Sequence, residues 1–279
     1  MTRLLSADRM RLRKSWIFWL MLIIAAAVSL RVFQDQRSMI AAEIRDGTAW
    51  PMDEAFFQFP VVNGILLSAF LPLFLGADFS DGTIRNKLIV GHRRGAIYCS
   101  YLLTAFISAG ILTVVTVIVN TAAGMLEGGK MTMAAHQLAV FLCSTFCCTF
   151  AFAAVFVLIS TQITNRAFSS VACIGSLLLM ILLSSRLISL LQIAPEARDM
   201  LALVDGKPVF SDPYPNPMYV AGVKRTIMEF VSDFLPTGQS IQMSNLEAER
   251  VSRFPLLSGA FVVFTSSVGL LAFRRKDIQ

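Results

Sequence analysis

Long runs without a charged residue dominate the pattern of hydrophobic and polar positions along the chain. Six stretches contain no Asp, Glu, Lys or Arg: Ser15–Leu30, Ala55–Ala77, Gly95–Leu126, Met131–Asn165, Ala167–Ser185 and Phe254–Phe273. A helix needs about 20 apolar residues to cross the hydrocarbon of a bilayer. A β-barrel would show short alternating segments instead, and none is visible. The pattern predicts an all-α integral membrane protein with six transmembrane helices, at residues 16–33, 56–78, 96–120, 135–160, 168–190 and 255–273.

Composition supports this class, because 56% of the 279 residues are hydrophobic and only 15% are charged. A soluble domain usually has about 25% charged residues.

The first span has a second interpretation, since Ala25-Ala26-Ala27 after a basic N-terminus resembles a cleaved signal peptide. The apolar run continues past the alanines, and Trp16 and Trp19 suit a membrane interface. We therefore expect a retained span.

The distribution of Lys and Arg predicts the orientation. Thirteen basic and four acidic residues lie in segments 1–15, 76–95, 161–167 and 274–279, against eleven basic and fourteen acidic on the other side. Positive residues favour the inside, so we expect a multi-pass protein of the cell membrane with both termini cytoplasmic. We expect no nucleic-acid partner, because no basic stretch is interleaved with stacking aromatic residues.

The five cysteines all lie in the predicted spans. Metal binding by Cys143, Cys147 and Cys148 is conceivable, but we favour packing within the bundle.

The chain is expected to be one transmembrane domain, residues 1–279, with three pieces outside the hydrocarbon. These are an interfacial amphipathic helix at 1–14, a cytoplasmic loop at 78–95 and a small external subdomain at 191–254. In that subdomain we expect a helix from Pro217 to Phe234 and a shorter one from Ala194 to Val204.

The cytoplasmic loop 78–95 has the features of a short rigid helix. Asp78 or Asp81 could cap it, and Gly91 is a stop signal. Ile84 and Leu88 are four residues apart and share one face. We expect that face to need the membrane surface or a partner protein, and we favour a partner.

The block Phe79-Ser80-Asp81-Gly82-Thr83-Ile84-Arg85-Asn86-Lys87-Leu88, with Gly91-His92-Arg93-Arg94, resembles the loop after the second span of ABC-2 type transporter permeases. Phe234-Leu235-Pro236-Thr237-Gly238-Gln239 is similar to the family's segment before the last span. Phe273-Arg274-Arg275-Lys276-Asp277-Ile278 is similar to its C-terminal ending. Within the family, the chain resembles small bacterial permeases of peptide, antibiotic or lantibiotic export and immunity.

The resemblance implies a permease subunit whose loop is a coupling helix seated on a separate ATP-binding subunit. The contact residues would be Asp81, Gly82, Thr83, Ile84, Arg85, Lys87 and Leu88. The chain has no G-x-x-x-x-G-K-[ST] phosphate loop, so it is not itself an ATPase and needs no cofactor of its own. ATP and magnesium would belong to that subunit. A second permease chain, identical or related, would complete the exporter.

The cargo path implied by the family lies between two permeases, mainly at the second and fifth spans. Candidate lining residues are Asn63, Ser68, Ser169, Ser170 and Ser176. Such residues also occur at ordinary helix-packing seams. No charge lies deep in a span, which favours an apolar or amphipathic cargo over ion coupling. Two alternatives stay open: a non-transporting immunity or receptor protein that binds its target at the external loop, and an intramembrane enzyme.

Overall fold

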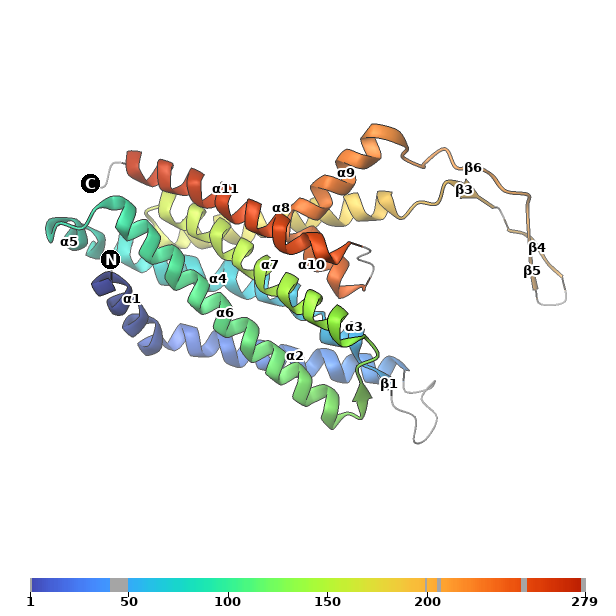
Figure 1. The fold of residues 1–279 in the computed structure, drawn as a ribbon, viewed down its shortest axis with the longest axis horizontal. Coiled ribbons are helices and arrows are strands. Elements are labelled where there is room, and N and C mark those ends of the chain that lie inside the picture. The colour runs from blue at the N-terminus through green and yellow to red at the C-terminus, as the bar shows by residue number, and fades with distance from the viewer. Residues whose placement is uncertain (1, 41–49, 199, 205–206, 247–249, 277–279) are drawn as a thin grey trace.

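The computed structural model describes residues 2–40, 50–198, 200–204, 207–246 and 250–276 (Figure 1). Its helices, in chain order, are α1 (Thr2–Lys14), α2 (Trp16–Ile40), α3 (Asp53–Phe56), α4 (Phe59–Ser80), α5 (Thr83–Ile89), α6 (Arg94–Leu126), α7 (Ala135–Gln162), α8 (Arg166–Leu191), α9 (Gly222–Phe234), α10 (Pro236–Ser244), the 3-10 turn η1 (Val251–Arg253) and α11 (Phe254–Arg275). Short strand pairs connect some of them: β1 (Trp50–Pro51) with β2 (Gly129–Lys130), β3 (Glu196–Ala197) with β6 (Tyr214–Pro215), and β4 (Met200–Val204) with β5 (Lys207–Phe210).

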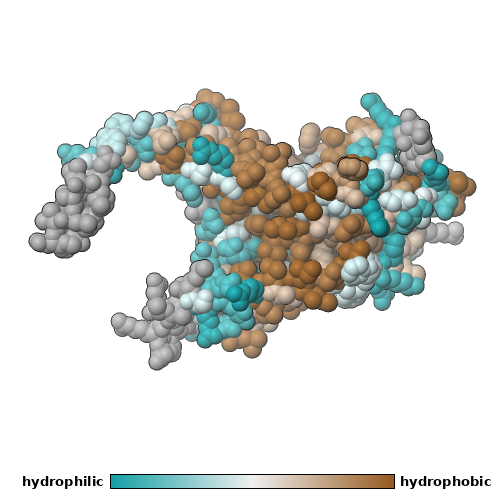
Figure 2. Space-filling model, turned by 180° about the vertical axis from the view of Figure 1, so that it is seen from behind, coloured by the Kyte–Doolittle hydropathy of each residue, from teal (hydrophilic) through white to brown (hydrophobic). Residues whose placement is uncertain are grey.

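The prediction of an all-α membrane protein with six spans is confirmed at the level of length and composition. The six apolar helical segments are Trp16–Ser38, Asp53–Ser80, Arg94–Leu126, Ala135–Gln162, Arg166–Leu191 and Val251–Arg275. Figure 2 shows a broad hydrophobic band across the middle of the molecule, with hydrophilic residues gathered toward its two ends. Both termini lie at the same end of the bundle (Figure 1), as an even number of spans requires. We refer to that end as the termini end and to the opposite one as the far end.

The bundle is built around α4 and α7. Two thirds of the apolar window of the α4 span is buried inside the protein, and 61% of that of α7, against 22% for α8 and 28% for α11. The outer helices therefore leave wide apolar faces uncovered, such as Phe168, Val171 and Leu182 on α8. In a bilayer these faces are in contact with lipid at no cost.

The predicted N-terminal helix forms, but it does not place its apolar face on the membrane. Leu4 and Leu12 of α1 are 4% and 2% exposed, and the helix packs on the first part of α6. Asp8 lies between them at four-residue spacing and is also buried. The interior of the protein thus takes up the face that we expected the lipid surface to cover.

The segment 191–254 also differs from the prediction. The described residues of 194–204 do not form a helix, because β3 pairs with β6 and β4 pairs antiparallel with β5 instead. These pairs make an extended arm that leads away from the bundle at the far end (Figure 1). The helix ending at Phe234 is confirmed as α9, although it begins only at Gly222.

After α9 the chain turns back into the bundle, a feature that we did not expect. Pro236 starts α10 and forces Leu235 before it into an extended conformation, which separates the two helices. The Thr237 hydroxyl donates a hydrogen bond to the carbonyl of Met180, near the middle of α8. The Cys148 thiol, near the middle of α7, lies 3.1 Å from the carbonyl oxygen of Pro236. Helix α10 is therefore a re-entrant segment, and the part of 191–254 that lies outside the bundle is smaller than expected.

Candidate functional site

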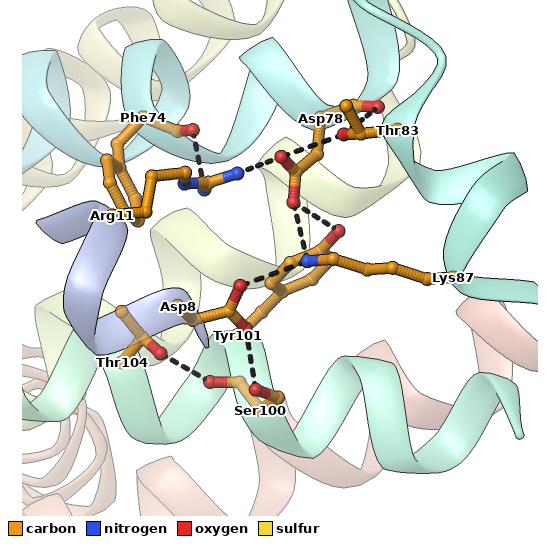
Figure 3. A network of polar contacts seen from close by, with 9 residues as sticks. All are labelled: Asp8, Arg11, Phe74, Asp78, Thr83, Lys87, Ser100, Tyr101 and Thr104. Atoms are coloured by element: carbon orange, nitrogen blue, oxygen red, sulfur yellow. Dashed lines mark hydrogen bonds and ion pairs between the residues drawn. The ribbon is translucent and has the colours of Figure 1, made fainter. Parts of the chain in front are cut away.

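Four segments meet in a buried polar cluster at the termini end (Figure 3). They are α1, the last turn of α4, the short helix α5 and the start of α6. We define the α5 cluster as Asp8, Arg11, Asp78, Lys87, Ser100 and Tyr101. Its two acids are each 3% exposed, so both carboxylates have lost nearly all contact with water. Burying a charge is costly unless it is paired and hydrogen-bonded, so the partners of these acids decide whether the arrangement can exist.

Asp78 is the centre of the cluster. One of its oxygens accepts hydrogen bonds from Arg11 and, over 3.0 Å, from the Thr83 hydroxyl at the start of α5. The other accepts from Lys87 Nζ and from the Tyr101 hydroxyl, each at 2.8 Å. Donors from α1, α5 and α6 therefore converge on one carboxylate at the end of α4, and the position of each segment depends on the others.

Lys87 connects the two acids. Its ammonium lies 2.8 Å from Asp78 and 3.0 Å from Asp8, and it also sits 4.6 Å from the centre of the Tyr101 ring. The second oxygen of Asp8 accepts a hydrogen bond from the Ser100 hydroxyl at 2.6 Å. A residue of the loop helix thus ties the N-terminal helix to the end of the second span.

The charges of the α5 cluster balance, with two carboxylates against one guanidinium and one ammonium. Burial lowers the pKa of Lys87 below its usual value, and the negative charge of Asp8 opposes that shift. Burial also lowers the pKa of Arg11, again opposed by Asp8. The acids therefore offset the cost of desolvating the two bases.

The loop helix is built differently from the prediction, although it lies where we expected it. Neither Asp78 nor Asp81 caps α5: its N-cap is Gly82, at a φ of 68°, with no side-chain capping bond. Gly91 does end the helix, at a φ of 92° with its N–H bonded to the Leu88 carbonyl. Glycine adopts these left-handed conformations without the strain of a Cβ, so the two glycines delimit a compact turn at each end of α5.

The expected coupling residues divide into two groups. Ile84 is 2% exposed, Leu88 packs on the core and Lys87 is held in the α5 cluster. The expectation that Ile84 needs an outside partner is therefore wrong, because the protein itself covers it, whereas Leu88 is half-buried. Asp81, Thr83 and Arg85 are exposed, and Gly82 is half-buried.

Sequence reasoning missed the most exposed apolar residues of this loop. Ile89, the last residue of α5, is 82% exposed and Val90 after it is 75% exposed, and we call these two residues the tip of the loop. It also missed the role of Asp8, which a simple signal could have revealed. Asp8 shares a helical face with Leu4 and Leu12, and an acid within an apolar stripe needs a buried partner.

The five candidate path residues lie on two neighbouring helices, Asn63 and Ser68 on α4 and Ser169, Ser170 and Ser176 on α8. Asn63 is fully buried and reaches Thr113 and Thr116 of α6 at 3.5 Å, leaving its carbonyl oxygen without a partner. Ser68, Ser170 and Ser176 bond to carbonyls of their own helices, and buried Ser169 has no partner for its hydroxyl. Within the described part of the chain, no hydrogen bond joins two of the five.

A second polar feature lies at the far end, between the end of α8 and the helices α9 and α10. It is a hollow of about 360 Å³ whose walls include Arg225, Glu229, Asp233 and Gln242. Arg225 is held by the Glu229 carboxylate at 3.0 Å and by the Leu191 carbonyl at 3.1 Å, and one of its nitrogens is buried without a partner. Burial raises the pKa of Asp233, and the hydrogen bond from Gln242 opposes that shift.

A scan of the sequence against protein-family models finds no match, and neither does a search of curated proteins. Function must therefore be inferred from the two polar sites and the sequence motifs. Of these sites, the α5 cluster joins four separate segments of the chain around charged groups, and it includes Lys87 of the loop motif that resembles a permease family.

Proposed function

We propose that this chain is the membrane-spanning subunit of an ATP-driven exporter of the ABC-2 type. A separate ATPase would dock on the loop helix α5 from the cytoplasm, and a second permease chain would complete the pathway. The cargo would be hydrophobic or amphipathic, such as a peptide, an antibiotic or a lipid-like molecule. The ATPase would bind the ATP and magnesium, since the chain has no phosphate loop.

The observation that carries the proposal is the double role of α5. Its inward side is fixed by Lys87 to both Asp8 and Asp78, so the helix cannot move without α1 and α4. Its outward side presents Arg85 together with the apolar tip Ile89 and Val90. A protein that pushes on this tip would act on two neighbouring segments at once, which is what the transmission of mechanical work requires.

The mechanism follows from this arrangement. When the ATPase subunits close, they would favour one position of α5 over another through contacts that differ between the two states. The α5 cluster would carry that shift into α4, whose neighbours α7 and α8 make up much of the bundle. Repacking of helices by small sliding movements is a common form of such transitions. In our proposal Lys87 is a positioning residue of the coupling, and the exposed tip makes the contact.

Site-specific crosslinking tests the proposal. A photo-crosslinking amino acid would replace Val90 in the full chain, expressed in the cells from which the gene comes. We expect it to capture a protein with a phosphate-loop motif, and the purified product to hydrolyse ATP. The matched control is Met125, which is 71% exposed at the far end and should not capture it. Capture of no ATPase from either position would contradict the proposed function.

The hollow at the far end favours one second candidate, a non-transporting immunity or receptor protein that binds its target there. Its wall carries both signs of charge, so it could hold a ligand with an ammonium and an anionic group. Protection of cells that persists without ATP hydrolysis would support this candidate over the exporter. Loss of protection when the partner ATPase is inactivated would support the exporter.

A further inference from the structure

The helix α1 has a second face that takes no part in the α5 cluster. Ser6, Arg9, Met10, Arg13 and Lys14 line a hollow of about 650 Å³ at the surface of the termini end. Arg9 and Arg13 are four residues apart, so they lie one above the other on the helix. All five residues are exposed, whereas Leu4, Asp8 and Leu12 on the opposite face are buried.

The charge on this face is not balanced by any ion pair in the part of the chain that the structure describes. Among the described residues, no ion pair involves Arg9, Arg13 or Lys14. The acid nearest in sequence, Asp8, is turned inward and bonded to Lys87 and Ser100. Three cations within six residues repel one another, and an anion brought among them relieves that repulsion.

The surface next to the cations is apolar. Helix α2 begins two residues after Lys14, and Trp16, Trp19 and Ile23 recur along one side of it with exposures of 70%, 53% and 64%. The Trp19 indole N–H donates a hydrogen bond to the Arg13 carbonyl at 2.9 Å, which fixes this ring beside the basic helix. Tryptophan prefers the boundary between headgroups and hydrocarbon.

The order of these groups matches the order of groups in a phospholipid. Cations come first, then two indole rings at the interface, then aliphatic side chains along a membrane-spanning helix. We propose that Arg9, Arg13 and Lys14 form a binding site for the headgroup of an anionic phospholipid, whose acyl chain lies along Trp16 and Ile23. A zwitterionic headgroup carries its own ammonium and would gain less from the three cations. Basic residues beside a membrane span attract anionic lipids in this way.

Tryptophan fluorescence tests this site directly, because the chain has three tryptophans and two of them lie at the site. Trp50 is 5% exposed at the far end and serves as an internal reference. The full chain would be reconstituted in mixed bilayers of phosphatidylglycerol and phosphatidylcholine at a fixed ratio. In each sample, only one of the two lipids would carry bromine, placed near the start of one acyl chain. We expect brominated phosphatidylglycerol to quench the fluorescence more than its mole fraction predicts, and brominated phosphatidylcholine to quench it less.

Two triple variants separate the site from net charge. R9Q/R13Q/K14Q should lose the excess quenching completely, and R93Q/R274Q/R275Q, which removes three exposed charges elsewhere at the termini end, should keep it. The variant R9K/R13K keeps the positive charge of the site and should also keep the excess quenching. Equal quenching by both lipids in the unmodified chain, or the same loss in both triple variants, would overturn the proposal. If soluble glycerol phosphate removed the excess quenching by brominated phosphatidylglycerol, the proposal would also be overturned, because the site would then bind a free phosphate.

Discussion

The ammonium of Lys87 on α5 lies 3.0 Å from a carboxylate oxygen of Asp8 on α1, a residue 79 positions earlier in the chain. The same ammonium lies 2.8 Å from Asp78 at the end of α4. One side chain of the loop helix therefore holds two other segments in place. Because both carboxylates are buried and Lys87 is largely shielded from water, removing one partner costs more than it would in an ion pair at the surface.

Replacing Lys87 with methionine should destabilise the protein strongly. The change leaves two buried carboxylates with only Arg11 as a cationic partner, and breaking a buried ion pair in this way typically costs about 3–5 kcal/mol. A lower midpoint in thermal unfolding of the detergent-solubilised protein would measure it. Arg93→Gln is a control, because Arg93 is exposed at the same end. The double variant D8N/K87M should lose less stability than the sum of its single variants. The D8N substitution removes one of the two carboxylate charges that K87M leaves without the Lys87 ammonium. Strict additivity would mean that the two residues do not interact.

Arg85→Glu and Val90→Asp should each lower ATP-linked transport at least about 30-fold while leaving the fold intact. Both side chains are exposed, and central contacts of an interface typically contribute 2 kcal/mol or more, about a 30-fold loss. This prediction depends on the proposed function and is measured as transport by the reconstituted complex. Lys87 is unsuitable for this test, because its charge is needed inside the protein. Normal transport by both variants, with unchanged thermal unfolding, would mean that the tip of α5 is not the docking surface.

Asp233→Asn should stabilise the protein at neutral pH. The folded-state pKa of Asp233 is raised by burial, so the folded protein binds its proton more tightly than the unfolded chain does. The resulting stability is present below about pH 4, the unfolded value, and is lost as the pH rises through the raised folded pKa. The asparagine variant should therefore unfold at a higher temperature than the unmodified chain at pH 7 and lose this advantage at acidic pH. The exposed Asp212→Asn serves as the control and should show no such trend.

Gly238→Ala should destabilise the re-entrant segment. A Cβ at this position would lie 2.0 Å from the carbonyl oxygen of Ser232, which is backbone and cannot move aside cheaply. Overpacking of this kind usually costs about 1–3 kcal/mol. Gly259→Ala is the matched control, because nothing lies within 4 Å of its added methyl group in α11. The control should unfold at the same temperature as the unmodified chain or a little higher. A stable Gly238→Ala protein would contradict the close approach of α9 and α10.

The six spans could be predicted because the bilayer imposes its own rule. Backbone groups in hydrocarbon must be paired within the element, so a long charge-free run has few alternatives to a helix. The loop helix at 83–89 was also visible, from Gly91 and from the spacing of Ile84 and Leu88. The re-entrant α10 was not, because a segment with Thr237, Gln239 and Ser240 is polar enough to resemble an external loop. Its polar groups are satisfied inside the bundle, for example by Met180 on α8 and Ser258 on α11.

By itself, the sequence determined that this chain is helical and has six segments long and apolar enough to cross a membrane, since the lengths and hydropathy of single segments are enough for that. Only the tertiary structure decided which surfaces are free. It turned Ile84 and Lys87 inward, and it placed Asp8 of α1 beside Lys87 of α5. Such pairings depend on which helices become neighbours in space, and the local periodicity of a segment carries no information about its neighbours.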